Sequence, residues 1–362
     1  MKILHGMREV AGQAYYSVKG IRAQSYKADL VLWDPSPFGY PIDRCLNIDF
    51  GNKKKYPWYF LKMGFNMIWA LTKYDTFHFH FGHSLMPHNF DLWLLKLLKK
   101  KLFFEFHGSD LRQGSIAVSL NSYTKEMAFA DERKLRKRAK KLFRYATGVI
   151  IHDDEQVPHI PTNLEKVHLV PLRVDLTRFS PEYPQAGKNK ITIVHAPSSR
   201  AGKGSRFIIS AVEKLSNNYN IEFILVEGMT QEDAFEQYKK ADIIIDQIIV
   251  GTYGVFAIEA MALGKPVITY ITDEMKEKLP AELPIVSANP DNLEERLENL
   301  VQDENKRIEL GERGAKYVKK YHNCYKNAKI LIDIYEGTHI PVSYTHLDVY
   351  KRQVECYRRT HG

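Results

Sequence analysis

A chain of 362 residues, 44% of them hydrophobic, can bury the cores of two globular domains and is too apolar for a disordered protein. It has no apolar run that approaches the length needed to span a bilayer, about 20 residues, and its first ten residues lack the apolar stretch of a signal peptide. Three cysteines without metal-ligand spacing fit a reducing compartment, so we expect a cytoplasmic protein.

The first half of the sequence alternates short apolar runs with helical patterns. A strand over 2–6 precedes a helix over 12–26, and the apolar run at 29–33 is the next strand. Further strands are expected at 77–81, 101–106 and 147–152, with helices at 90–101 and 132–144. Strands separated by helices indicate βαβ units and a parallel sheet.

A proline-containing stretch without periodicity, near 171–187, separates this half from a second alternation of strands and helices. We therefore predict an α/β protein with two Rossmann-like domains facing each other across a cleft, with ligands at the carboxyl ends of the strands. The expected segments are a first domain at 1–172, a linker at 173–188, and a second domain with C-terminal helices at 189–340.

The end of the chain does not continue the pattern. Residues 342–353, VSYTHLDVYKRQ, resemble the translation of two transposase adapters joined back to back, a contaminant of sequencing libraries. We therefore treat 341–362 as an artefact and expect no function from it.

Positive charge is concentrated in the first half, which carries a net +10 over residues 1–175 against −3 over 176–340. Basic clusters lie at 53–55, 99–101 and 132–144. Solvated helix faces above core aromatics would explain this pattern, and so would contact with an anionic membrane. No nucleic-acid-binding motif accompanies the charge, so we expect no nucleic acid partner. The aromatic residues near the first cluster are Trp58, Tyr59, Phe60, Phe65 and Trp69.

The segment 251–268, GTYGVFAIEAMALGKPVI, combines a glycine-bearing turn with the start of a helix. Free backbone amides at a helix N-terminus favour phosphate, and Glu259, two turns into the helix, can accept hydrogen bonds from sugar hydroxyls. An ordinary αβ unit with a glycine-rich start is the structural alternative.

This segment resembles the donor-binding signature of the retaining glycosyltransferase family 4, which has the GT-B fold. The resemblance implies that Glu259 is the second glutamate of the family's Glu-x7-Glu motif and holds the nucleotide ribose. The first glutamate would stand at position 251, where this chain has Gly251. Its contact to the donor sugar would pass to the backbone amides of Tyr253, Gly254, Val255 and Phe256, or to Asp246 and Gln247.

Two further segments carry the resemblance. In HAPSSRAGKG, starting at His195, Lys203 and Gly204 match the family's Lys-Gly pair, which implies that the lysine neutralises the donor diphosphate. Arg200 is a loose substitute for the family's arginine, and Ser198 and Ser199 can add hydroxyl donors to the phosphates. In EFHGSD, His107 is implied to contact the reacting sugar, with Asp110 orienting it or binding acceptor. Gly12 matches the glycine of the first loop at the donor.

A metal site is not expected. His78 and His80 alternate with phenylalanines on one face of a strand, and neither cysteine nor carboxylate completes a ligand set with them, His83 and His88. The acidic run at 152–155 ends a strand of the first domain rather than forming a metal motif. We therefore expect a metal-independent enzyme without cofactor.

The resemblance implies a retaining hexosyl transfer from a nucleotide-diphosphate sugar to a glycan or lipid-linked acceptor, in cell-surface polysaccharide or glycolipid synthesis. The basic first half suggests a peripheral location at the inner face of the cell membrane. Two alternatives stay open: a nucleotide-sugar epimerase with the same fold, and a non-catalytic subunit that binds nucleotide sugar.

Overall fold

The computed structural model describes residues 1–36, 39–162 and 164–341 and divides the chain into two compact units. The first unit contains 1–113, 130–173 and the helix that starts at Cys324, and the second contains 114–129 and 174–323. This differs from the expected boundaries, because residues 114–129 join the second unit and the last helix joins the first. The segment interpreted as an artefact lies outside the described residues, apart from Pro341.

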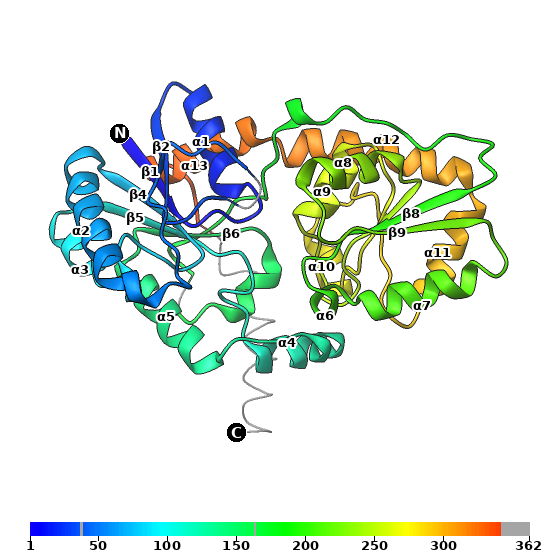
Figure 1. Ribbon diagram of the computed structural model, residues 1–362, viewed down its shortest axis with the longest axis horizontal. Coiled ribbons are helices and arrows are strands. Elements are labelled where there is room, and N and C mark those ends of the chain that lie inside the picture. The colour runs from blue at the N-terminus through cyan, green and yellow to red at the C-terminus, as the bar shows by residue number, and fades with distance from the viewer. Residues whose placement is uncertain (37–38, 163, 342–362) are drawn as a thin grey trace. The chain divides into compact units, whose positions relative to one another are not determined.

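The first unit is built on a parallel sheet of seven strands in the order β3-β2-β1-β4-β5-β6-β7 (Figure 1). The central strands are buried on both faces, which explains why they read as near-continuous apolar runs. Its strands are β1 (Lys2–Met7), β2 (Lys27–Leu32), β3 (Arg44–Cys45), β4 (Thr76–His80), β5 (Lys101–Glu105), β6 (Gly148–Ile151) and β7 (Val167–Leu169). Its helices are α1 (Gln13–Ala23), α2 (Tyr56–Lys73), α3 (Leu92–Leu97), α5 (Glu132–Tyr145) and α13 (Cys324–Glu336).

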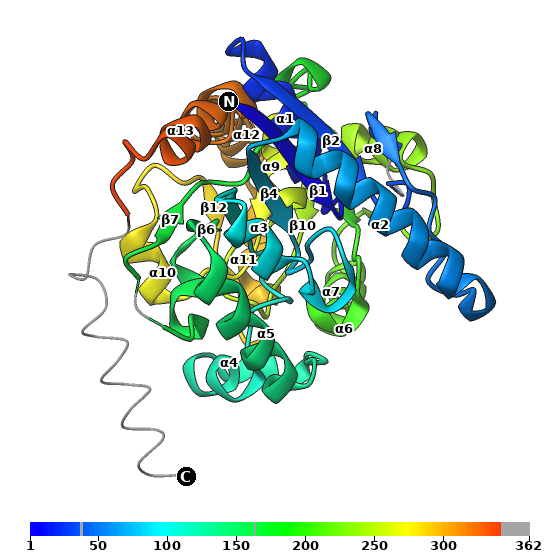
Figure 2. The same cartoon turned by 90° about the vertical axis from the view of Figure 1, so that its left-hand side faces the viewer.

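Helices cover both faces of this sheet. On one face, α1 and α13 pack together over Ile3, Leu30 and Phe103. On the other face, α2, α3 and α5 bury their apolar residues against Phe77, Phe79 and other side chains of the central strands (Figure 2). The sheet order changes direction at β1, so the carboxyl ends of β1 and β4 form the point where a doubly wound sheet binds its ligand.

The second unit repeats this plan with five parallel strands in the order β12-β11-β10-β8-β9. Its order changes direction between β8 and β10, which places the expected ligand site at the carboxyl ends of these two strands. Its strands are β8 (Ile191–His195), β9 (Ile221–Leu225), β10 (Ile243–Ile245), β11 (Val267–Ile268) and β12 (Ile285–Val286). Its helices are α4 (Gly114–Leu120), α6 (Arg200–Lys203), α7 (Ser205–Leu215), α8 (Gln231–Lys240), α9 (Val255–Ala262), α10 (Asp273–Lys278), α11 (Leu293–Gln302) and α12 (Glu304–Tyr321).

The α/β prediction and the Rossmann-like plan of each half are confirmed. The short strands β3, β7 and β12 were not expected, because two or three residues carry no readable period. Helix α2 was also missed, since its sequence is apolar on nearly every face and shows no amphipathic pattern. Among the described residues, no helix combines the length and apolarity that crossing a bilayer requires.

The close crossing of α1 and α13 gives a first prediction. A Cβ added at Gly20 would lie 2.5 Å from Cys324 O and 2.6 Å from Ala328 Cβ. Gly20→Ala should therefore lower the free energy of unfolding by about 1–3 kcal/mol, because the helices must separate. In Gly64→Ala the new methyl group meets nothing within 4 Å, so helix propensity should stabilise the protein by about 0.5–1 kcal/mol.

Urea unfolding followed by tryptophan fluorescence measures both variants. All four tryptophans, at positions 33, 58, 69 and 93, lie in the first unit, so the signal reports on that unit. Equal stability of the two variants would contradict the close crossing.

Candidate functional site

Charged and polar groups of the second unit gather at the carboxyl ends of β8 and β10. The Nζ atom of Lys203 lies 2.7 Å from Asp246 Oδ1 and 2.8 Å from Gln247 Oε1. Lys203 ends α6, whereas Asp246 and Gln247 directly follow β10. The Asp246 side chain is fully buried and that of Lys203 is 15% exposed, so the ammonium is fixed at the sheet edge by a lysine that is not fully buried.

The N-terminus of α9 lies beside this ammonium. Gly254 is its N-cap residue, and no side chain caps the first amides. A Cβ added at Gly254 would stand 3.8 Å from Asp246 Oδ2 and 3.9 Å from Lys203 Nζ, so the helix start and the lysine are neighbours. Asp246 Oδ2 is buried and has no hydrogen-bond partner in the described structure. A cation beside uncapped helix amides is an arrangement that binds phosphate.

The backbone conformation at position 251 favours glycine. Gly251 has φ +98°, in the left-handed region, and a Cβ there would lie 2.7 Å from Thr272 Cγ2 and 3.2 Å from Asn121 Nδ2. Asn121 in turn donates to the carbonyl oxygens of Ile249 and Val250 and holds the loop in place. A glutamate would be strained on this backbone, because Thr272 and Asn121 occupy the space where its side chain would start.

Glu259 lies half-buried on α9. Burial raises the pKa of its carboxyl to about 7, with Arg178 opposing the shift and Asp246 adding to it. Burial and the charge of Glu259 also raise the pKa of Tyr238, whose ring lies 4.9 Å from that of Phe256. Phe256 and Val255 are partly exposed in the first turn of α9. A carboxyl with a pKa near 7 can accept a hydrogen bond from a ribose hydroxyl when it is ionised, and it can donate one when it is protonated.

The remaining predicted donor residues lie around α6. Ser199 caps α6 by accepting a hydrogen bond from the Gly202 amide, and Ser198 is exposed. Arg200 is exposed and forms a two-pronged pair with Glu227, at the end of β9 rather than at Lys203. Gly204 has φ +74°, and its Cβ position is occupied by Ile248, which explains the glycine that joins α6 to α7.

In the first unit, His107 directly follows β5 and Asp110 lies three residues later. Asp110 Oδ1 accepts a hydrogen bond of 2.8 Å from the His107 amide, so it orients the backbone of this loop and not the imidazole. Asp110 is 1% exposed, which leaves it no open face toward an acceptor. Its burial raises the pKa of the carboxyl to about 6. The imidazole of His107 is oriented instead by His80 and His152, each with a ring nitrogen 3.2 Å away.

A buried network extends from His107 into the sheet. His80 also contacts His5 at 3.1 Å, and the Tyr335 hydroxyl bridges His5 and His78. Glu105 lies among these rings and forms an ion pair with the fully buried Arg173. Glu105 and Arg173 were not among the predicted site residues. The carboxylate of Glu105 within the otherwise apolar run KLFFEF was the signal that could have indicated a buried charge.

Glu105 supplies a carboxylate beside the histidines, which contradicts the expectation that no carboxylate accompanies them. The groups His5–His78–His80 and His80–Glu105–His107 each bring three ligand atoms within 4.8 Å of one another. However, Glu105 is already neutralised by Arg173, and the ring nitrogens of His5, His80 and His107 contact each other. These contacts account for the cluster as a hydrogen-bonded network. His83 and His88 belong to neither group.

Gly12 caps the N-terminus of α1 with φ +80°. A Cβ there would lie 2.5 Å from the Tyr16 ring and 2.9 Å from the Tyr40 hydroxyl, so packing of the first loop requires the glycine. Glu9 accepts hydrogen bonds from the first amides of α1, and burial raises the pKa of its carboxyl to about 7. The amides at this helix start are therefore already occupied.

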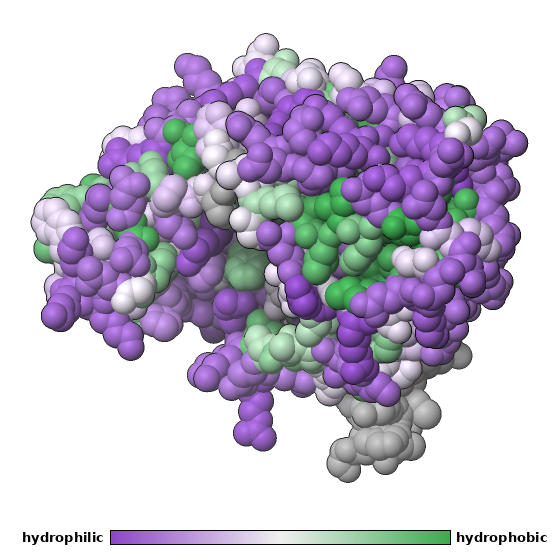
Figure 3. Space-filling view, turned by 45° about the vertical axis from the view of Figure 1, so that its right-hand side comes forward, coloured by the Kyte–Doolittle hydropathy of each residue, from purple (hydrophilic) through white to green (hydrophobic). Residues whose placement is uncertain are grey.

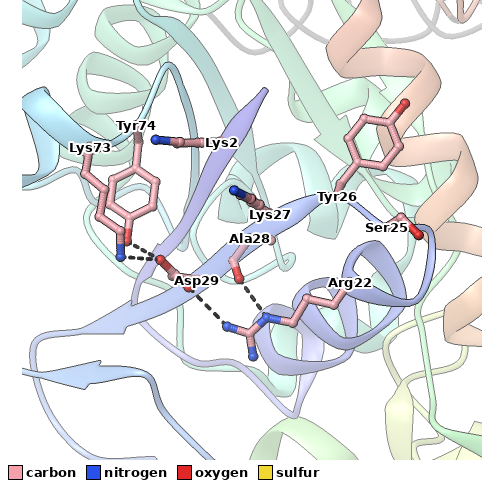
Figure 4. Close-up of a pocket in the computed structure, with 9 residues that line it drawn as sticks. All are labelled: Lys2, Arg22, Ser25, Tyr26, Lys27, Ala28, Asp29, Lys73 and Tyr74. Carbon is pink, nitrogen blue, oxygen red and sulfur yellow. Dashed lines mark hydrogen bonds and ion pairs between the residues drawn. The ribbon is translucent and has the colours of Figure 1, made fainter.

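A pocket of about 580 Å³ lies at the opposite, amino edge of the first sheet (Figure 4). Asp29 at its wall accepts hydrogen bonds from Arg22, Lys73 and Tyr74. These bonds tie α1 and α2 to β2, and no predicted site residue lines the pocket. We therefore regard it as a structural junction.

Comparison with known families gives a match in the second unit. Residues 184–317, which contain the Lys203 site and α9, match the model of the family glycosyl transferases group 1. No curated protein matches the sequence significantly.

Solved structures that cover 93% of this chain show that both units together have the GT-B fold. Sucrose-phosphate synthase from Thermosynechococcus elongatus is 16% identical with a TM-score of 0.64, covering 93% of this chain and 99% of its own. HepE from Anabaena, solved with UDP, is 12% identical with a TM-score of 0.63, covering 93% and 100%. A glycosyltransferase from Rickettsia africae is 14% identical with a TM-score of 0.64, covering 93% and 97%. At these identities the likeness concerns the fold.

The buried histidines make the first unit sensitive to acid. Burial lowers the pKa of His152 from 6.5 to about 4, so the unfolded chain binds a proton at a pH where the folded chain does not. The stability that the neutral ring permits is complete above about pH 6.5 and is lost as the pH falls toward 4. This single group should cost about 3 kcal/mol over that range, since one pKa unit corresponds to about 1.4 kcal/mol.

Urea unfolding at several pH values, followed by tryptophan fluorescence, tests this. His152→Gln should weaken the pH dependence between pH 6.5 and 4 by about one proton, whatever its effect at neutral pH. His88→Gln, at an exposed position, is the control and should leave the slope unchanged. An unchanged slope in His152→Gln would refute the assignment.

The Gly251 geometry gives a third prediction. Gly251→Glu, which restores the family's pattern, should destabilise the second unit by about 1–3 kcal/mol, because backbone strain and overpacking add. Gly228→Glu is the matched control, since Gly228 also has positive φ but open space around it, and should cost about 1 kcal/mol. Scanning calorimetry resolves the transition of the second unit, and an undisturbed transition in Gly251→Glu would contradict the steric argument.

Proposed function

We propose that the protein is a retaining glycosyltransferase that moves a hexosyl group from a nucleotide-diphosphate sugar to a glycan or lipid-linked acceptor. The observation that carries the proposal is the Lys203 ammonium beside the uncapped start of α9. Both features lie in the segment of the group 1 family, and HepE, a protein of the same fold, was solved with UDP.

In this mechanism the diphosphate accepts hydrogen bonds from the α9 amides around Gly254 to Phe256 and charge from Lys203. Asp246 acts as a positioning residue, because it holds the ammonium at the sheet edge until phosphate oxygens compete for it. Glu259 binds the ribose hydroxyls. The leaving group's developing negative charge is stabilised by fixed positive groups, which is the electrostatic contribution that transfer requires. The chain's own residues supply this charge, so the proposal needs no metal.

The contact that the family's first glutamate would make is assigned to backbone amides. Gln247 is a poor substitute for the missing glutamate, because its Oε1 accepts from Lys203 and its Nε2 donates to the Thr252 carbonyl. Asp246 holds Lys203 through Oδ1, and its Oδ2 is buried. The amides of Tyr253 to Phe256 are therefore our candidates for the donor sugar. For the first unit, we propose that His107 hydrogen-bonds the sugar by giving up its ring contact with His80, while the contact with His152 is kept. Asp110 and His152 are the positioning residues.

The substitution at Gly251 also supports a second candidate, a subunit that binds nucleotide sugar without transferring it. A thermal-shift screen over nucleoside diphosphates and nucleotide sugars identifies the donor, since ligands that bind only the folded state raise the melting temperature. Turnover of that donor with membrane or glycan acceptor extracts favours the enzyme. Donor binding without turnover, and without sugar isomerisation, favours the subunit.

The lysine gives the decisive prediction. Lys203→Ala should lower kcat/KM by a factor of about 10² to 10³, as expected for the loss of one fixed donor to a developing anion. Lys214→Ala, an exposed lysine paired with Glu294 on the far end of α7, is the control and should leave activity unchanged. Near-normal kcat/KM in Lys203→Ala would remove the basis of the proposal.

A further inference from the structure

Helix α2 of the first unit carries two apolar stripes. The first consists of Tyr59, Met63, Asn66 and Ala70, which repeat at helical spacing and are buried against the sheet. The second consists of Trp58, Leu61, Phe65 and Ile68, which also repeat at helical spacing and lie on the opposite side of the helix. Phe65 is 70% exposed and Trp58 is 63% exposed.

Helix α3 also has exposed apolar side chains on its outer surface. Leu92 and Leu95 are buried under the helix, whereas Trp93 is 60% and Leu97 68% exposed. The ends of the two helices are tied together, because Lys100, just after α3, donates hydrogen bonds to Leu71 O and Tyr74 O at the end of α2. We call the combined area the α2–α3 face. Its exposed apolar side chains are Tyr56, Trp58, Phe60, Leu61, Phe65, Ile68, Phe90, Trp93, Leu97 and Leu98.

Isolated exposed apolar residues are normal, but ten large exposed apolar side chains on and beside two helices that cover the same face of the sheet mark an interaction surface. Within residues 1–36, 39–162 and 164–341 the face is not covered by another element, since these side chains are exposed. Apolar side chains stand between hydrophilic ones along the left-hand edge of the molecule in Figure 3, where α2 lies.

The charge around the face is of one sign. Residues 52–73 and 92–104 contain no aspartate or glutamate. Lys53, Lys54 and Lys55 are exposed at the start of α2, and Lys96 and Lys99 are exposed at α3. Lys101 is not available, because it donates to the Tyr335 carbonyl. Apolar and interfacial aromatic side chains bordered by lysines match a bilayer with anionic head groups.

A second copy of this chain fits the face less well. A two-fold interface would bring the same lysine-bordered surface of both copies together, and no acidic residue of the face could compensate the repulsion. We therefore propose that the α2–α3 face docks onto a membrane surface that contains anionic lipid, with its apolar stripe entering the head-group region. The docking would bring the first unit to a membrane-borne acceptor, but it does not depend on the proposed transfer reaction.

The test is binding of the full chain to lipid vesicles, measured by flotation without any donor. Vesicles of phosphatidylcholine with phosphatidylglycerol should bind the protein, those of phosphatidylcholine alone should bind it far less, and high salt should weaken binding. Leu61→Gln with Phe65→Gln should reduce the affinity at least about tenfold, because two apolar side chains no longer leave water. Replacement of Lys53, Lys54 and Lys55 by glutamine should reduce it about a hundredfold.

Met229→Gln, which removes an exposed apolar side chain from the second unit, is the control and should bind like the wild type. All changed positions are exposed, and urea unfolding checks that the variants remain folded. Brominated lipid should quench the fluorescence of Trp58 and Trp93 in the wild type.

Equal binding to neutral and anionic vesicles would overturn the proposal, and so would full binding by the Leu61→Gln, Phe65→Gln variant. A dimer in solution that this variant dissociates would assign the face to self-association instead. Because no nucleotide sugar is present, failure here leaves the transferase proposal standing, and failure of Lys203→Ala to lose activity leaves the membrane proposal standing.

Discussion

The proposed donor site of the second unit depends on one interaction. It holds a positive charge at the carboxyl edge of the sheet, where the strand order reverses. The charge is that of Lys203, whose ammonium is paired to the buried Asp246 and to Gln247. An unpaired lysine beside the positive end of α9 would be repelled by it and would move into solvent. Pairing to Asp246 therefore keeps the cation and the helix start together, and it explains why a carboxylate lies beside the helix start that we propose binds phosphate.

The same interaction explains the glycines around the site. Gly204 lets α6 turn into α7 against Ile248, and Gly254 keeps side-chain atoms away from the helix amides. Gly251 belongs to the same loop but has a different cause, because Asn121 and Thr272 occupy the space beside it. The glycine at position 251 is therefore matched to the packing of Asn121 and Thr272 beside it.

Much of this architecture could be predicted from the sequence, because parallel strands buried on both faces read as apolar runs and helices separate them. The choice of Lys203 and of the α9 start rested on the resemblance of their segments to the glycosyltransferase family, together with their place after strands of the second alternation. The partner of Lys203 was not predicted, because nothing in the sequence distinguishes Asp246 from any other carboxylate after a strand. Helix α13 was assigned to the second domain because it follows that domain in the sequence. Sequence order does not indicate that a helix returns to the first sheet, where the Tyr335 hydroxyl contacts His5 and His78.

The histidine network could not be predicted from the sequence for a different reason. Which ring nitrogen carries a proton depends on the contacts between the side chains, and these are known only from the structure. From the Val170 carbonyl, which only accepts, the contacts run through His152, His107, His80, His5, Tyr335 and His78. When neutral, each of these six side chains has one proton to donate. The six contacts use all six protons, so none is left for the second ring nitrogen of His78, where the chain of contacts ends.

At that end His78 Nε2 faces Glu105 Oε2 at 3.1 Å, and both atoms lack a hydrogen-bond partner. Burial lowers the pKa of His78 while Glu105 opposes the shift, so this is where the network would take up its first additional proton. Arg173, paired to the same carboxylate, raises the electrostatic cost of that proton. Burial thus lowers the pKa of these rings, with Arg173 adding to the shift and Glu105 opposing it. Neutral rings allow His107 to keep a fixed tautomer at the end of β5.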